Sequence, residues 1–204
     1  MARPKATPEQ REEVRRGIQQ AAAELYRSEG IAAISARSVA RKAGVSVGTI
    51  YTHFSDLTAL MQSLWTGRVE RQNAKFRALA QQYADPSERL KALMTAYLSF
   101  GVDNVDLYRG VFLFVRPESH ETPDAEPLQS YAFPALLIEA VHEGQSSGQF
   151  VDAPPETLVQ ILWSGLHGCL ALPINLDRVA FMPAAEMAEG TIKALVRAIA
   201  ASGD

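Results

Sequence analysis

Residues 35–54 read SARSVARKAGVSVGTIYTHF, and this pattern predicts two short helices joined by one tight turn. Ser35 can cap the first helix, because its hydroxyl can accept a hydrogen bond from a backbone N–H left unpaired in the first turn. Val39, Ala40 and Ala43 then recur at i, i+1 and i+4 and form a narrow apolar stripe. Gly44 follows where a residue in the left-handed conformation ends a helix at little cost.

The second short helix of this stretch carries a different surface. Val45 is expected to return to the core, Ser46 to cap the helix, and Ile50 and Phe54 to point inward at i and i+4. The other face of this helix holds small or polar side chains without acidic groups, namely Val47, Gly48, Thr49, Thr52 and His53. Two helices joined by a turn containing glycine, with a non-acidic outer face, indicate a helix-turn-helix that reads DNA.

The same residues resemble the DNA-binding domain of TetR-family transcriptional regulators. The matching positions are Gly44, Val45, Tyr51, His53 and Phe54, followed by Leu60, and the resemblance covers residues 8–64. Leu57 departs from it, because the family commonly has a phosphate-contacting lysine three residues after the phenylalanine. The resemblance implies a homodimer that binds a palindromic operator, and a C-terminal domain that binds a small molecule.

The predicted DNA contacts fall into two groups. Arginine can bind guanine through two hydrogen bonds, and threonine can offer its methyl group to thymine. We therefore expect base-edge contacts from Arg37, Val47, Gly48 and Thr49. Tyr51 and His53 are the candidates for phosphate contacts, although a tyrosine there can also be core and a histidine a helix-end cap. Ser46 and Thr52 complete the predicted DNA-binding set.

The charge of the chain is unevenly distributed. The net charge is −3, but residues 1–53 hold nine Arg or Lys and five Asp or Glu, a net of +4, which leaves −7 for the rest. A basic head on an acidic body indicates polyanion binding at one end. The phosphate attraction is expected from part of one basic set: Arg3, Lys5, Arg11, Arg15, Arg16, Arg37, Arg41 and Lys42.

The location of the protein is predicted from its single cysteine and its apolar segments. Cys169 cannot form an internal disulfide and is compatible with a reducing compartment. We also expect no apolar stretch near the ~20 residues of a membrane span and no signal peptide at the N-terminus. These observations predict a cytoplasmic protein with no membrane partner.

Helical periodicity continues through the whole chain and predicts an all-α fold. Thr7, Pro8 and Gln10 predict a capped start for the first helix, and Gly30 its end. A long helix is expected over about 56–83, followed by helices over 86–102, 105–115, 127–146, 155–172 and 184–201, with Pro134 a candidate kink and 116–126 a loop. We expect two domains: 1–55, a three-helix DNA-binding bundle, and 56–204, a helical domain for effector binding and dimerisation.

Large amphipathic side chains in the body have two interpretations. They can form core, or they can line an apolar pocket for an apolar or aromatic ligand. The ligand-binding candidates are Met61, Trp65, Tyr97, Phe100, Tyr108, Phe112, Trp163 and His167. Trp163 and His167 stand at i and i+4 in WSGLHGCL, which resembles a motif of the TetR subfamily named WHG, although such a pair is more often packing than ligand contact.

The predicted function is a TetR-type repressor that dimerises through 155–172 and 184–201. His142-Glu143 lacks the second histidine of a zinc motif, and neither a phosphate loop nor a Gly-x-Ser-x-Gly elbow is present. We therefore expect no enzyme activity, metal or cofactor. The alternatives are a helical small-molecule-binding or enzymatic protein with a vestigial DNA-binding head, and a DNA-binding regulator without an effector.

Overall fold

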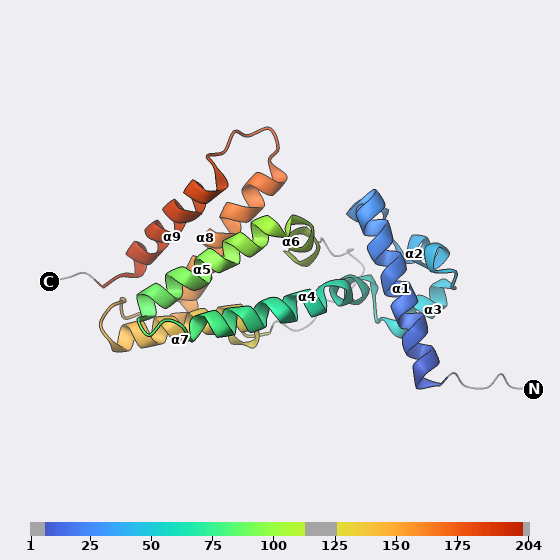
Figure 1. The fold of residues 1–204 in the computed structure, drawn as a ribbon, viewed down its shortest axis with the longest axis horizontal. Coiled ribbons are helices and arrows are strands. Elements are labelled where there is room, and N and C mark those ends of the chain that lie inside the picture. Colours follow the sequence, from blue (N-terminus) through green and yellow to red (C-terminus); the bar gives the residue numbers. More distant parts are fainter. Residues whose placement is uncertain (1–6, 113–125, 202–204) are drawn as a thin grey trace, which may run out of the picture. The chain divides into compact units, whose positions relative to one another are not determined.

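The computed structural model describes residues 7–112 and 126–201. Within these ranges the chain is helical, as predicted, and its only β-type pairing is an isolated bridge between Phe150 and Ala200. The helices, shown in Figure 1, are α1 (Pro8–Glu29), α2 (Ala36–Ala43), α3 (Val47–His53), α4 (Leu57–Ala80), α5 (Pro86–Asp103), α6 (Val105–Phe112), α7 (Ala132–Ser146), α8 (Pro155–Asn175) and α9 (Ala184–Ile199). The 3-10 turns are η1 (Ile31–Ala33) and η2 (Leu128–Ser130).

The structure divides into two compact units. The first comprises Met1–Val69 with Arg109–His120, and the second Glu70–Tyr108 with Glu121–Asp204. The residues of α4 and α6 are therefore divided between the units. The predicted functional boundary at 55/56 lies inside the first unit and stays a prediction. Arg3, Lys5 and most of the predicted loop at 116–126 lie outside the described residues.

The first unit is built around α1, which contacts both α2 and α3. Its core contains Ile18, Val39, Ile50, Leu60 and Met61, each at most 1% exposed. Further along the chain, the indole of Trp65 packs edge-on against Tyr26. A Cβ at Gly110 would meet that indole, so glycine at this position allows α6 to lie directly against Trp65.

The second unit is organised around α5, which contacts α7, α8 and α9 (Figure 1). These helices approach closely at two glycines. A Cβ at Gly101 of α5 would collide with Leu170 of α8, and one at Gly165 of α8 would collide with Leu195 of α9. Because the missing side chains admit their larger neighbours, α5 packs closely against α8 at Gly101, and α8 packs closely against α9 at Gly165.

Several predicted helix limits need correction. The long helix ends at Ala80 rather than 83, α8 continues through Pro173 to Asn175, and α9 stops at Ile199. The helix expected over 127–146 is split into η2 and α7, which begins at Ala132. Pro134 therefore lies in the first turn, where the missing N–H has no helical partner to lose, and it is not a kink.

The expectation that no helix has membrane-spanning length was wrong for α8. By length and composition alone, α8 is apolar enough to cross a membrane. A single such helix is weak evidence, because a core helix of a soluble protein passes the same test. One side of α8 does contribute to the core of the second unit, through Leu158, Leu162, Leu166 and Leu170.

Candidate functional site

The turn between α2 and α3 has the geometry that its sequence predicts. Ser35 Oγ accepts from the Ser38 backbone N–H at 3.1 Å, while Ser38 Oγ accepts from the Ser35 N–H at 2.9 Å, which closes a capping box. Gly44 has φ 69°, in the left-handed region. Ser46 Oγ then accepts from the Thr49 N–H at 3.0 Å and starts α3. Each end of the turn is therefore stabilised locally.

The outer face of α3 is accessible and uncharged. Gly48 and Thr52 are exposed, Val47 is 36% exposed and Tyr51 50% exposed, whereas Ile50 on the opposite side is completely buried. Among the other predicted contacts, Arg37 and Ser46 are exposed, while Thr49 and His53 are half-buried.

Two hydroxyl groups on α3 have partners within the chain. Thr49 Oγ1 lies 2.8 Å from Ser46 Oγ, and the Thr52 hydroxyl donates to the Gly48 carbonyl at 2.9 Å. These hydrogen bonds orient both threonine side chains. Because their hydroxyl groups already have partners, their methyl groups are the parts most readily available to contact a base.

Arg15 of α1 contacts the C-terminal end of α3. Its Nη1 donates to the His53 carbonyl at 3.4 Å, and its guanidinium carbon lies 4.7 Å from the centre of the Phe54 ring. The carbonyl at the end of a short helix and the face of an aromatic ring both attract a cation. The sequence predicts Arg15 among the residues that attract phosphate, but in the structure its guanidinium contacts the His53 carbonyl and the Phe54 ring. No local pattern indicates this contact, because Arg15 and His53 are 38 residues apart.

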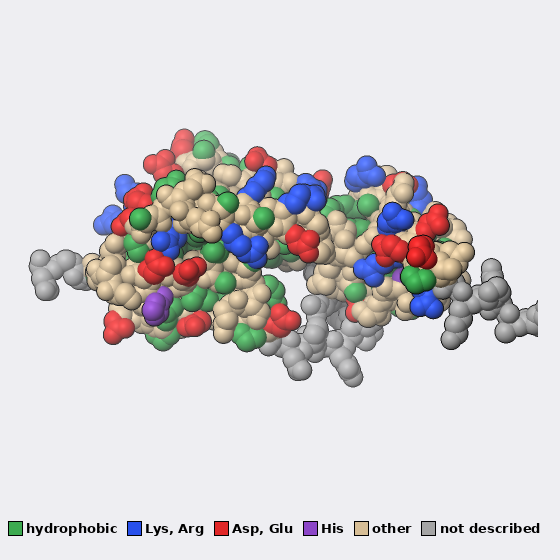
Figure 2. Space-filling view, turned by 60° about the horizontal axis from the view of Figure 1, so that its bottom comes forward, with side chains coloured by type: hydrophobic (Ala, Val, Ile, Leu, Met, Phe, Trp, Pro, Cys, Tyr) green, Lys and Arg blue, Asp and Glu red, His purple; other side chains and the backbone are tan. Residues whose placement is uncertain are grey.

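The other basic residues of the predicted phosphate-attracting set differ in whether they form an ion pair within the protein. Lys42 pairs with Glu24 at 3.4 Å, and this exposed pair is worth little in water. Arg11, Arg16, Arg37 and Arg41 are exposed. On the face of the molecule seen in Figure 2, Lys and Arg side chains are interspersed with Asp and Glu and form no continuous basic patch.

A second group of predicted residues meets in the interior of the second unit. His167 Nε2 lies 3.0 Å from the Tyr97 hydroxyl, and His167 Nδ1 lies 2.6 Å from the Tyr108 hydroxyl. The Trp163 ring packs edge-on against the same imidazole, with centroids 5.1 Å apart. Since a neutral imidazole has one donor and one acceptor nitrogen, one tyrosine hydroxyl accepts a hydrogen bond from the ring and the other donates one to it.

The ionisable groups of this cluster are held neutral. Burial lowers the pKa of His167 below its ordinary value. Burial also raises the pKa of Tyr108 to about 12. Burial raises the pKa of Tyr97 still further. At neutral pH the cluster is therefore polar and aromatic but uncharged.

Of the other four ligand-binding candidates, one lies near this cluster and three lie in the first unit. Phe100 joins the cluster through Phe76, whose ring lies 6.5 Å from Phe100 and 6.3 Å from Tyr97. Met61, Trp65 and Phe112 belong to the first unit, where Met61 and Trp65 are buried and Phe112 is 42% exposed. No group of three metal-ligating side chains occurs within the described ranges.

Comparisons with known families agree with this geometry. Residues 18–64 match the family model "Bacterial regulatory proteins, tetR family", and residues 90–199, more than half of the chain, match "Tetracyclin repressor-like, C-terminal domain". The chain belongs to the TetR family. The WHG resemblance is not addressed by these models and stays a prediction.

Individual relatives of this TetR-family chain match it over less than half of its length and at about 30% identity. It is 28% identical over 95 residues to the HTH-type transcriptional regulator SAB2452 of Staphylococcus aureus (47% of this chain, 51% of that protein). It is 31% identical over 83 residues to the HTH-type transcriptional repressor KstR2 of Mycobacterium tuberculosis (40% and 42%). The matched region thus spans about half the length of these relatives.

Solved structures of TetR-family proteins share the fold over nearly the whole chain. A TetR family transcription regulator from Marinobacter aquaeolei VT8 aligns with a TM-score of 0.65 at 19% identity, covering 96% of this chain and 100% of that one. RolR in complex with resorcinol aligns with a TM-score of 0.64 at 15% identity, covering 96% and 92%. At such identities the likeness is one of fold.

Proposed function

We propose that this TetR-family protein is a cytoplasmic transcriptional repressor that binds a palindromic operator in double-stranded DNA as a homodimer, and that a small neutral aromatic ligand releases it. The observation that carries the proposal is the α2–turn–α3 unit, whose caps and left-handed glycine present an accessible, uncharged helix face. A helix face without acidic groups can enter the major groove without repelling phosphate.

The proposed DNA contacts follow from exposure. Arg37, Val47, Gly48 and Thr49 contact base edges, with Thr49 acting through its methyl group. Tyr51, which is 50% exposed, contacts a phosphate. Arg37 and Arg41 supply part of the salt-dependent attraction. Leu57 has no charge to replace the family's lysine, so one backbone contact is absent at this position.

The proposed dimer uses the outer surfaces of α8 and α9. Glu156 is the only Asp, Glu, Lys or Arg in α8, and Ile161 and Leu172 are 52% and 49% exposed. Only 28% of the most apolar 18-residue window of α8 is buried within the chain itself. An apolar helix face of this size favours burial against another protein surface, and an isologous contact gives the two-fold symmetry of a palindrome.

The proposed effector site is the cluster of Tyr97, Tyr108, Trp163 and His167. It contains hydrogen-bonding groups and aromatic rings without a net charge, so it favours a neutral polar aromatic compound over an ion. RolR, a fold relative, is described in complex with resorcinol, which belongs to this chemical class. We expect α4, whose residues are divided between the two units, to transmit the ligand's effect to the DNA-binding unit.

Selection of bound sequences from random duplex DNA tests the DNA-binding part. The selected sequences should be palindromes with half-sites about 34–36 Å apart or a multiple of this distance. Arg37→Ala and Thr49→Ala should each weaken specific binding by ~1–3 kcal/mol more than non-specific binding. Tyr51→Phe should weaken both to the same extent. Failure to enrich any sequence would reject the proposal.

Calorimetry with and without operator tests the effector part. Resorcinol and related neutral phenols are the first compounds to titrate. A compound that releases the operator must itself bind more weakly, by the same factor, when the operator is present. Equal affinities in both titrations would show binding without regulation.

A further inference from the structure

A groove separate from the aromatic cluster runs between α5 and α9 of the second unit. It has a volume of about 800 Å³. Leu98 of α5 and Ile192 and Val196 of α9 contribute buried apolar side chains to its lining, with exposures of 2%, 7% and 8%. Ala185 and Ala188 also line it and keep it wide because their side chains are small. The volume lies within the usual range for small-molecule sites, roughly 300–1,000 Å³.

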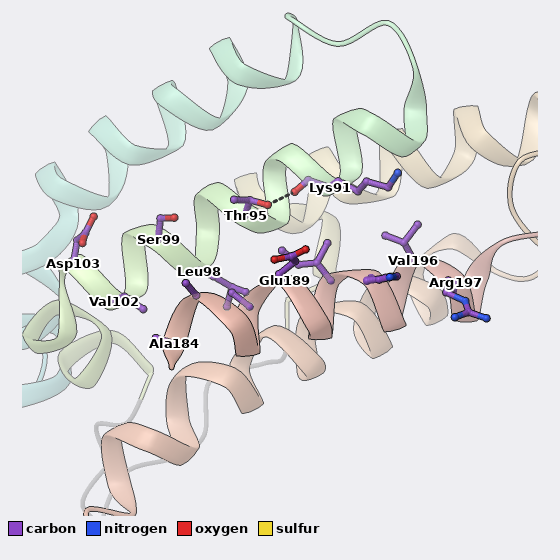
Figure 3. Close-up of a pocket in the computed structure, with 14 residues that line it drawn as sticks. Lys91, Thr95, Leu98, Ser99, Val102, Asp103, Ala184, Glu189, Val196 and Arg197 are labelled. Atoms are coloured by element: carbon purple, nitrogen blue, oxygen red, sulfur yellow. Dashed lines mark hydrogen bonds between the residues drawn. The ribbon is translucent and has the colours of Figure 1, made fainter. Parts of the chain in front are cut away.

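The two ends of this groove carry opposite charges. Figure 3 shows Lys91 and Arg197 at one end, and Asp103 with Ala184 at the other. Lys193 lies one helical turn before Arg197 and adds a third cation near the first end. The arrangement follows from the antiparallel course of the two helices, which places the start of α9 beside the end of α5.

The three cations of the groove differ in whether they are already paired with a carboxylate. Lys91 is already paired with Glu88 at 2.7 Å. Lys193 and Arg197 are exposed, and neither forms an ion pair with any described residue, although Glu189 stands one turn before Lys193 on the same helix. Two unpaired cations beside an apolar floor can contact an anion without first breaking a salt bridge.

We propose that the α5–α9 groove binds an amphipathic monoanion, of the class of medium-chain carboxylates. The carboxylate contacts Lys193 and Arg197, where charge-assisted hydrogen bonds are available. The apolar chain lies over Leu98, Ile192 and Val196, where its burial is favourable. Asp103 repels a carboxylate from the other end, and Glu189, which lies between the two ends in Figure 3, repels it from the middle of the groove, so the carboxylate is directed to the basic end. The site is independent of the effector proposed for the aromatic cluster.

Decanoate is a suitable probe for this site. Calorimetry on the full-length protein should show an affinity tighter than about 1 mM. The chemical shifts of the Leu98, Ile192 and Val196 methyl groups should move on binding, and those of the deeply buried Leu162 should not. Decyltrimethylammonium, which has the same chain with a positive head, should not bind at the basic end.

Two kinds of variant test the charge and the shape of the groove separately. The double variant Lys193→Gln/Arg197→Gln should weaken decanoate about tenfold or more, because it removes both unpaired cations. The matched control Arg71→Gln/Lys75→Gln removes the same charge from exposed positions of α4 that do not line the groove. Ala185→Trp should also weaken binding, because it fills the groove without changing its charge.

The proposal is overturned by any of three results. The first is no decanoate binding tighter than about 1 mM. The second is equal weakening by the charge variant and its control, which would show only general attraction to net charge. The third is an absence of chemical-shift changes at the Leu98, Ile192 and Val196 methyl groups when decanoate binds. DNA binding is not a readout in any of these measurements, so the result does not depend on the proposed repressor function.

Discussion

At the scale of single residues, Arg15 leads to a prediction about positioning. It contacts the His53 carbonyl and the Phe54 ring, so its loss should displace the last turn of α3. Arg15→Gln should therefore weaken specific DNA binding by ~1–3 kcal/mol, comparable to losing a base contact. Arg15→Lys should behave similarly, because lysine has neither the planar fork nor the ring-stacking surface of arginine.

The salt dependence of binding separates this role from a phosphate contact. If Arg15 only positions α3, the slope of log affinity against log salt should be nearly unchanged in Arg15→Gln. A phosphate-binding arginine lowers the slope by about 1 when it is neutralised. Full activity of Arg15→Lys together with a lowered slope for Arg15→Gln would assign Arg15 to phosphate instead.

His167 leads to a prediction about pH. Burial lowers its pKa in the folded state, so below the ordinary value of 6.5 the unfolded chain binds more protons than the folded one. The free energy of unfolding should therefore fall as pH decreases through about 6.5, and the loss should continue until the folded-state pKa is reached. At higher pH this contribution should be constant.

Thermal unfolding at pH 7.5, 6.5 and 5.5 measures this effect. His167→Gln should reduce the loss of stability between the highest and lowest pH, after correction for the variant's own stability. His142→Gln is the matched control, since His142 is exposed on α7. An unchanged pH dependence in His167→Gln would show that other groups cause the acid sensitivity.

At the scale of helices, the contact between α5 and α8 depends on Gly101. A methyl group at this position would overlap with Leu170 Cδ1, and Leu170 is itself buried. Gly101→Ala should destabilise the protein by ~1–3 kcal/mol through overpacking, despite a gain of up to ~1 kcal/mol in helix propensity. Urea unfolding followed by circular dichroism measures the difference.

Gly17 of α1 provides the comparison for Gly101. Its Cβ position has nothing within 4 Å, so Gly17→Ala should be neutral or stabilising. Destabilisation of both variants by the same amount would attribute the effect of Gly101→Ala to something other than its contact with Leu170.

The sequence correctly predicts the helix ends that are fixed by interactions between residues close together in the chain. Thr7, Ser35, Ser46 and Gly44 are caps or turn residues acting within a few positions, and each has its predicted role. The split of the 127–146 segment was not predicted, because periodicity alone does not distinguish a 3-10 turn followed by a bend from a helix that starts earlier.

The contacts between distant residues in the candidate sites could not be predicted from the sequence. The Trp163–His167 pair follows from i, i+4 spacing, but Tyr97 and Tyr108 are 70 and 59 residues from His167. The sequence predicts both tyrosines as ligand contacts, but it does not predict that both hydroxyl groups contact one imidazole. The α5–α9 groove was missed for the same reason, since nothing in either helix identifies its neighbour.

At the scale of the whole molecule, the proposed dimer gives a prediction for α8. Ile161 is 52% exposed at the centre of its uncharged face. Ile161→Asp would place one carboxylate from each subunit in an apolar interface, and burying unpaired like charges is strongly unfavourable. Sedimentation at micromolar protein should show a dimer for the parent chain and a monomer for the variant.

Val111→Asp is the control for this substitution. Val111 is also β-branched and 38% exposed, but it lies on α6 rather than on the proposed interface. It should leave the dimer intact. A parent chain that sediments as a monomer would contradict the dimer, and with it the binding of a palindrome by two equivalent heads.

If the proposed dimer forms through the nearly uncharged surface of α8, protein concentration becomes a determinant of stability. If folding is completed by pairing, the unfolding temperature should rise with total protein, because mass action favours the associated state. Dilution would then do more than separate two subunits: it would expose an apolar helix to water and favour unfolding. A cell holding few copies of this protein would keep part of it unpaired and open to proteolysis, so the amount synthesised would set both operator occupancy and the lifetime of the chain.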